Sequence, residues 1–230
     1  MHGKRSVWIC GLVALFVSAG TSARADSVAD AEALVREIYF EGLPYESASS
    51  LDTAAVRRLI EMLADPMETP HHGNIVLALG MSGHSEAFDA LSEFAHNPLV
   101  GEVDRNTFRA RTHTPLAMGH LAREDARALR WLLQLESRTV RNPNPGWHFR
   151  HLRGESLASV LQEQALTGLA LSGAPGAVAA LDRAATGPEI DVRTERRGHH
   201  ARRLIELHHR VATEGAAAVM SSHVGGDAGP

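Results

Sequence analysis

The sequence predicts an all-α chain, organised as an α-solenoid of stacked antiparallel helix pairs. Three observations carry this prediction. Apolar residues recur at helical spacing and almost nowhere alternate at the two-residue period of β-strands. Proline and glycine interrupt these apolar stripes at regular intervals. Similar segments also return along the chain, which is typical of proteins built from stacked repeats.

The first segment, residues 1–25, has the pattern of a secretory signal peptide. Lys4 and Arg5 precede an apolar run over residues 7–19, and Ala23-Arg24-Ala25 has the small residues of a cleavage site. A membrane anchor is the alternative, but the run is shorter than the ~20 apolar residues that a membrane span needs. We therefore expect an exported protein, periplasmic or extracellular, that does not insert into the membrane. The exported chain would contain no cysteine, since Cys10 is the only one.

Residues 26–214 are predicted to form one helical domain of about nine helices. The clearest apolar stripes lie at residues 28–38, 56–63, 88–94, 126–133 and 157–165. Helix breakers or caps separate them at Pro44, Asp65-Pro66, Pro70, Gly83, Asn97-Pro98, Gly173 to Gly176 and Gly187-Pro188. The last segment, residues 215–230, ends in small, polar and glycine-rich sequence, so we expect a disordered tail there.

An internal repeat supports the helix pairs. Residues 79–91 align without a gap to residues 169–181, and both share a Ser-Gly turn and an Ala-Leu ending. A looser copy occupies residues 116–132. Each copy reads as a helix, a tight turn and a second helix, and three such units are enough for neighbouring pairs to bury each other's apolar faces.

The second copy carries a resemblance to a known family. The pattern Gln164-Ala165-Leu166-x-x-Leu169-x-x-Ser172-Gly173-x-Pro175-x-Ala177-Val178-x-Ala180-Leu181 resembles a HEAT repeat of the short bacterial, phycobilisome-lyase-like kind. The resemblance covers roughly residues 51–212 and implies a fold, not an activity, because such proteins serve as scaffolds, chaperones and occasionally enzymes. Pro115, inside a predicted helical stretch, departs from the pattern.

Charge is divided unevenly along the chain. Residues 26–104 carry a net charge of −12 and residues 105–214 carry +6, while residues 26–230 together carry −7. Nucleic-acid binding by the whole chain is excluded, because phosphate contacts need a surplus of basic residues. Two parts of opposite sign would steer charged partners, and they would also allow charge-driven self-association that weakens with salt.

An insertion at residues 139–155 is longer than a repeat turn requires, and it is rich in arginine, proline and aromatic residues. Long insertions in repeat proteins often bind partners, and Trp and Arg are enriched at interface hot spots. The alternative is that the two aromatic side chains fold back over a helix end while the arginines stay solvated. The candidate binding residues here are Trp147, Phe149, Arg150 and Arg153.

A second basic segment, residues 193–210, is predicted to be mostly helical and contains six arginines and four histidines. It would bind an anionic partner more strongly below about pH 6.5, as histidines protonate. The alternative is the solvated outer face of a terminal repeat. The secondary candidate binding residues are Arg196, Arg197, Arg202 and Arg203.

Histidine is abundant, with thirteen residues after position 25, and supports a competing hypothesis. A periplasmic metal-binding protein or metalloenzyme would use several of His71, His72, His96, His200, His208 and His209. The iron-binding His-Glu dipeptides of the deoxyhypusine hydroxylase branch of HEAT proteins are absent from the sequence, as are nucleophile elbows and phosphate loops. The favoured interpretation is a protein-binding or scaffold module with no catalytic activity, cofactor or metal.

Overall fold

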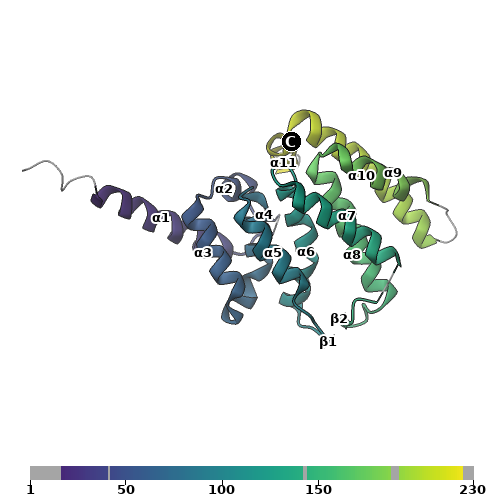
Figure 1. The fold of residues 1–230 in the computed structure, drawn as a ribbon, viewed down its shortest axis with the longest axis horizontal. Coiled ribbons are helices and arrows are strands. Elements are labelled where there is room, and N and C mark those ends of the chain that lie inside the picture. The colour runs from purple at the N-terminus through teal and green to yellow at the C-terminus, as the bar shows by residue number, and fades with distance from the viewer. Residues whose placement is uncertain (1–16, 41, 142–143, 188–191, 225–230) are drawn as a thin grey trace, which may run out of the picture.

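The computed structural model describes residues 17–40, 42–141, 144–187 and 192–224, and within them it leaves out the side chains of residues 17–25, 140, 192–197 and 222–224. These ranges contain eleven α-helices, two 3-10 helices and two very short strands (Figure 1). The all-α prediction is confirmed, with more helices than expected. The elements are α1 (Val17–Arg36), α2 (Tyr45–Ser49), α3 (Thr53–Ala64), η1 (Pro66–His71), α4 (His72–Met81), α5 (Glu86–His96), β1 (Gly101–Glu102), α6 (Arg105–Leu121), α7 (Ala126–Arg141), β2 (Trp147–His148), α8 (Glu155–Ser172), η2 (Pro175–Ala177), α9 (Val178–Thr186), α10 (Val192–Glu214) and α11 (Ala216–Val224).

Consecutive helices pack as pairs: α3 with α4, α5 with α6, α7 with α8, and α9 with α10. The second helices of these pairs also lie side by side in chain order, because α4 packs against α6, α6 against α8, and α8 against α10. At the start of the chain α1 packs on α3 and α4, and at its end α11 contacts both α10 and α2.

Aspartate side chains begin several of these elements. Asp52 accepts a hydrogen bond from the Ala55 N–H at 2.8 Å at the start of α3. Asp104 does the same at the start of α6, accepting from the Asn106 and Thr107 N–H groups. A side-chain oxygen at this position satisfies backbone donors that have no partner within the helix. The hydroxyl of Thr107, followed by these backbone groups, lowers the pKa of Asp104 and keeps the cap ionised.

Helix α4 lies in the middle of the core. Its residues His72 to Gly80 are all buried, so it has no polar face. In α3, by contrast, Val56, Leu59 and Leu63 are buried while Arg57 is exposed. A helix covered on all sides carries no amphipathic stripe, which is why the apolar pattern identified α3 and not α4.

Small residues bring the backbones of α4, α6 and α8 into direct contact. A Cβ atom on Gly80 of α4 would collide with the backbone of Ala117 in α6. A Cβ on Gly119 of α6 would collide with the backbone of Gly168 in α8, and one on Gly168 would collide with the carbonyl oxygen of Pro115. Pro115 lies inside α6, which continues through it. Pro115, which departs from the repeat pattern, therefore lies where α6 contacts α8.

The two clearest copies of the sequence repeat share one local structure. In the first, the Ser82 hydroxyl donates to the Leu79 carbonyl and accepts from the His84 N–H, and Gly83 has a φ of 71°. In the second, Ser172 donates to Leu169 and accepts from Ala174, and Gly173 has a φ of 58°. Glycine adopts positive φ without steric cost, so it ends both helices in the same way.

The start of the described chain is a long helix that includes the predicted cleavage site. Helix α1 runs continuously past the predicted cleavage site after Ala25 and projects from the body in Figure 1. Its first buried side chains among those described are Ala31 and Val35. Residues 1–16 and 225–230 lie outside the described residues.

The predicted disordered tail, residues 215–230, requires a correction. Residues 216–224 form α11, and Ala216 and Val219 are buried against Val211 with Tyr45 packed beside them. Burial of these small apolar side chains stabilises α11, although the composition of the segment gives no sign of a buried helix. No helix within the described ranges is both long and apolar enough to cross a bilayer.

We predict that Gly168→Ala lowers the free energy of unfolding by about 2–3 kcal/mol, because the added methyl group must displace the backbone of α6. The matched control is Gly73→Ala in α4, where the new Cβ would meet only the flexible side chain of Arg109 at 3.2 Å. We expect the control to change stability by less than about 1 kcal/mol. Urea unfolding followed by circular dichroism measures both, and equal losses in the two variants would contradict the proposed contact.

Candidate functional site

The insertion at residues 139–155 is anchored to the segment that precedes α6. Strand β2 pairs in parallel with β1, with Gly101 opposite Trp147 and Glu102 opposite His148. The Val103 N–H also donates to the His148 carbonyl at 2.9 Å. The insertion then reverses direction, because Phe149 and Leu152 exchange backbone hydrogen bonds of 3.1 and 2.9 Å. These bonds tie residues 147–152 of the insertion to the segment before α6 and to one another.

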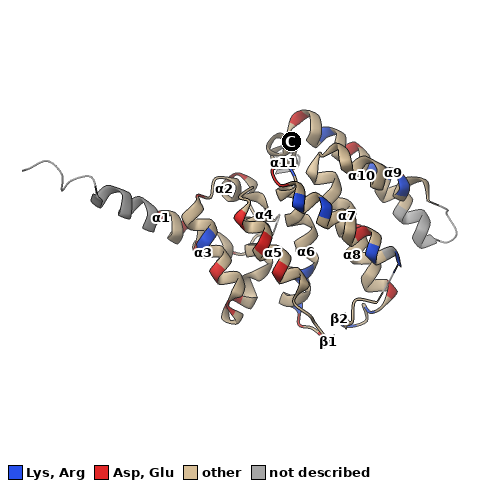
Figure 2. Cartoon of the chain, viewed as in Figure 1, with Lys and Arg blue, Asp and Glu red and all other residues tan. Residues whose placement is uncertain are grey.

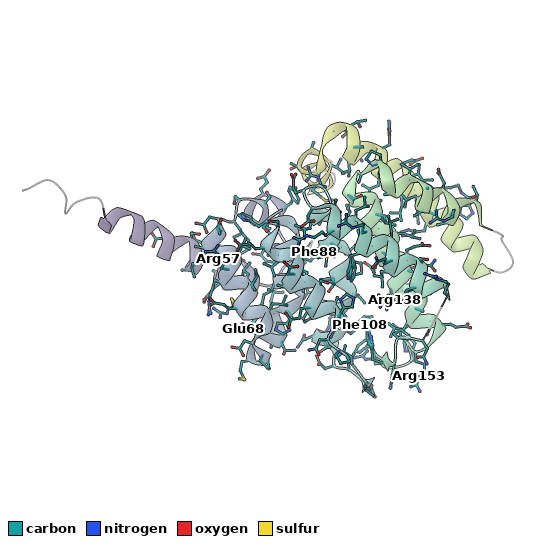
Figure 3. The ribbon with its side chains drawn as sticks, in the orientation of Figure 1. Arg57, Glu68, Phe88, Phe108, Arg138 and Arg153 are labelled. Atoms are coloured by element: carbon teal, nitrogen blue, oxygen red, sulfur yellow. The ribbon has the colours of Figure 1, made fainter. Side chains whose placement is uncertain are left out.

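Three aromatic side chains meet at this end of the molecule, and we call Phe108, Trp147 and Phe149 the aromatic platform. The rings of Phe108 and Phe149 stack with centroids 4.4 Å apart and an angle of 17° between their planes. Trp147 meets Phe108 edge-on at 6.4 Å. Figure 3 shows Phe108 and Arg153 near the strands. The two aromatic residues of the insertion are half-buried on α6, as the structural alternative predicts.

Two arginines remain exposed on this platform. The guanidinium carbon of Arg150 lies 5.1 Å from the centroid of the Phe149 ring, within the range of a cation–π interaction. Arg153 donates to the Arg150 carbonyl at 3.2 Å. Arg150 has a φ of 54°, and it is the only non-glycine residue with a positive φ in the part of the chain that the structure describes. The structure thus brings the four predicted residues of the insertion together.

The secondary candidate residues lie elsewhere, on α10. Arg202 and Arg203 are exposed, and Arg202 donates to the Ala185 carbonyl at the end of α9 at 3.4 Å. The side chains of Arg196 and Arg197 lie outside the described residues. Figure 2 shows basic residues on α7 and α10 and acidic residues on α5.

Ion pairs inside the acidic part use up its few basic groups. Glu32 accepts from both Arg58 and Arg36 at 2.6 Å, and Arg57 pairs with Glu86 at 2.9 Å. The hydrogen bond from Arg58, followed by that from Arg36, lowers the pKa of Glu32. These are the only arginines in residues 26–104, which contain no lysine, so any further compensation must come from the rest of the chain, as when Arg127 pairs with Asp89 at 3.3 Å.

The histidines of the metal hypothesis mostly bond individually to the protein's own polar groups. His72 bonds the Asp65 carbonyl at 3.1 Å, His96 the Ser92 carbonyl at 2.7 Å, and His208 the Ala174 carbonyl at 3.0 Å. His200 lies 3.5 Å from the Thr167 hydroxyl. Among the described residues, no group of three or more His, Cys, Asp or Glu side chains could hold a metal ion.

Burial also opposes the protonation of several histidines. It lowers the pKa of His120 to about 4, with a smaller contribution from Arg123. Burial is likewise the first cause of the lowered pKa values of His113 and His200. His200 belongs to the basic segment of α10, so it protonates at lower pH than the sequence-based expectation of pH 6.5 assumed.

A pocket of about 700 Å³, which the sequence reasoning missed, lies between α3, η1, α5 and α6. Its apolar lining includes Ile60, Leu63, Phe94 and Leu99. Its polar lining includes His72, Thr107 and Arg111. A volume in this range and a mostly apolar wall with a few polar groups are typical of small-molecule sites.

Arg111 is the unusual residue of this pocket, with only 9% of its surface exposed. Its two terminal nitrogens donate to the carbonyls of Ala95 and Asn97, at 2.7 and 2.6 Å, where α5 ends. Its Nε is buried without a hydrogen-bond partner, and no carboxylate among the described residues lies within 4 Å. Burial lowers the pKa of Arg111 to about 10, so the guanidinium remains charged at neutral pH. Nothing in the local sequence distinguishes Arg111, which lies among Arg109, Thr112 and His113 in α6.

No family model, curated protein or solved structure matches the chain. Function must therefore be argued from the geometry and chemistry of the sites themselves.

We predict that His120 makes the fold sensitive to acid. The unfolded chain binds a proton near pH 6.5 and the folded chain only near pH 4, so stability is lost as the pH falls through this interval, by up to about 3 kcal/mol. His120→Leu should flatten the dependence of unfolding free energy on pH between 6.5 and 4. The exposed His151→Leu is the control, and a pH dependence unchanged by His120→Leu would refute the assignment.

Proposed function

We propose that the chain is an exported binding module without catalytic activity, built as an α-solenoid of HEAT-like helix pairs. Two features support the solenoid. The second helices of four successive pairs pack in chain order, and the two clearest repeat copies have the same Ser-Gly turn. Export, to the periplasm or beyond the cell, is supported by the charge and apolar pattern of residues 1–25.

The observation that carries the binding function is the conformation of Arg150. A left-handed backbone costs a non-glycine residue about 1–2 kcal/mol, and strain of this kind concentrates at functional sites. Here the residue with this backbone has its guanidinium over the Phe149 ring, 5.1 Å from the centroid. A glycine at this position would relieve the strain, but it would have no guanidinium. We therefore take the arginine side chain to be the reason that a strained residue occupies this position.

The aromatic platform also favours tight binding because it is formed in advance. Strand pairing and ring stacking already hold the insertion, so a partner would not have to order it. Stacked aromatic residues with arginines beside them have the composition of interface hot spots. The acceptor on the partner would be acidic, since Arg150 and Arg153 are both cationic and exposed.

The basic surface of α10 is a secondary contact in this proposal. Arg202 and Arg203 would extend the attraction to an acidic partner beyond the aromatic platform. The acidic part of a second copy of the chain has the complementary sign, with a net charge of −12 over residues 26–104. A partner of this kind would dissociate as salt is raised, because exposed charges are screened over about 10 Å at 0.1 M ionic strength.

We predict that stability and partner binding respond differently at position 150. Arg150→Gly and Arg150→Ala both remove the guanidinium, and both should reduce partner capture. Because glycine tolerates the positive φ, Arg150→Gly should be about 1 kcal/mol more stable than Arg150→Ala in urea unfolding. Capture is measured with a photo-crosslinking residue at exposed position 151, which leaves Arg153 in place, in cells that export the chain, followed by identification of the crosslinked protein.

The matched control places the crosslinker at Arg130, an exposed arginine of α7 away from the insertion. A discrete adduct from position 151 that disappears in Arg150→Gly, and is not formed from position 130, supports the proposal. Equal adducts from both positions, or an adduct unchanged by Arg150→Gly, would show that the platform is not the contact surface.

A further inference from the structure

We propose that the pocket between α3, η1, α5 and α6 binds a small organic carboxylate that carries an apolar group, with the carboxylate paired to Arg111. None of the residues that line this pocket belongs to the aromatic platform. The proposal therefore stands or fails independently of partner binding at Arg150. Its basis is a buried cation without an anion, placed in the wall of a cavity large enough for a ligand.

The structural role of Arg111 accounts for only part of its side chain. Two of its N–H groups satisfy the carbonyls of Ala95 and Asn97 at the end of α5, where cations are favoured by the helix dipole. A guanidinium has five N–H donors, so three remain after these two bonds. One of them, on Nε, is buried without a partner. A helix end carries only a partial negative charge, whereas a carboxylate would neutralise the whole cation.

Two hydroxyl groups and one imidazole in the lining of the pocket already have partners. The Thr107 hydroxyl donates to Asp104 at 2.6 Å, and the Thr69 hydroxyl donates to the Pro66 carbonyl at 2.6 Å. His72 must carry a proton on Nε2, because the Asp65 carbonyl at 3.1 Å can only accept. The ring of His72 is held further by Phe94, which it meets edge-on at 5.7 Å. Arg111 is the one arginine in the lining of this pocket, and its two terminal nitrogens keep two further N–H donors for a ligand.

The rest of the wall selects an apolar body for that ligand. Ile60, Leu63, Phe94 and Leu99 line the pocket, and the guanidinium of Arg111 lies 4.8 Å from the centroid of the Phe94 ring. An apolar group that occupies part of this pocket of about 700 Å³ would displace water from these side chains. A ligand with one charged end and one apolar end matches this lining.

Charge around the pocket favours a monoanion over phosphate or sulfate. The pocket is built mainly from residues 60–99, inside the part of the chain with a net charge of −12, and exposed Glu93 lies at its edge. These acidic groups would repel a dianion more strongly than a monoanion. A dianion would also lose more hydration energy than a monoanion on entering a pocket with an apolar lining. A single carboxylate meets one guanidinium with no excess charge.

The test uses phenylacetate as the probe and its uncharged analogue phenylacetamide as the matched control. Binding of each to the purified exported chain is measured by titration calorimetry. We expect phenylacetate to bind and phenylacetamide to bind at least about tenfold more weakly. Inorganic phosphate should not compete. Failure of phenylacetate to bind at about 10 mM, equal binding of the amide, or displacement by phosphate would each overturn the proposal.

Variants locate the site. Arg111→Met should weaken phenylacetate binding about tenfold or more, while Arg130→Met on α7 should leave it unchanged. Because Arg111→Met also removes two hydrogen bonds from the end of α5, the pocket is blocked separately by Ala64→Trp at an exposed position in its lining. We expect about a fivefold or larger loss there, with the unfolding midpoint preserved.

Glu93→Gln provides a change of the opposite sign. Removal of this exposed carboxylate from the edge of the pocket should strengthen phenylacetate binding about twofold, and added salt should reduce the gain. Binding that is unaffected by both Ala64→Trp and Glu93→Gln would place the probe elsewhere on the protein and overturn the assignment.

Discussion

The arrangement of the whole molecule depends on the direct backbone contact between α4, α6 and α8. Gly80, Gly119 and Gly168 have no side chain at the points where these helices meet, and the carbonyl of Pro115 faces Gly168. Close packing of this kind fixes the distance and the register of each helix against the next, because dense interiors do not deform continuously. The outer helices α3, α5 and α7 then pack around an inner row that is already set.

Helix α6 connects this constraint to both candidate sites. Gly119 and Pro115 fix its position in the core, and the same helix presents Phe108 to the aromatic platform and Arg111 to the pocket. A shift of α6 by a fraction of an ångström would change the ring stacking and the pocket together. The two sites are nevertheless chemically distinct, because one exposes its arginines to solvent and the other buries its arginine beside an apolar wall.

Sequence periodicity located the helices that keep one face in water and overlooked those that do not. The stripe in α3 alternates buried Leu59 with exposed Arg57, whereas α4 is buried along nearly its whole length and has no such contrast. The insertion was found because its composition is unusual for a repeat turn. The pocket was not found, since its wall combines residues from α3, η1, α5 and α6 that lie as far apart in the chain as Ile60 and Arg111. Helix α11 was missed because its small apolar residues are buried by contacts with other helices, with Val211 of α10 and with Tyr45 of α2, far away in sequence.

By itself, the sequence determined the all-α class, the Ser-Gly turns and the residues of the insertion, because each depends on local spacing or on the conformational freedom of glycine. The packing of distant helices is what stacks Phe149 on Phe108, sets Trp147 edge-on to it, leaves Arg150 exposed and buries Arg111 without a carboxylate. Burial and pairing are set by the neighbours that other helices provide. No local pattern records which helix will cover a given arginine, and that is why the same residue type is exposed at position 150 and buried at position 111.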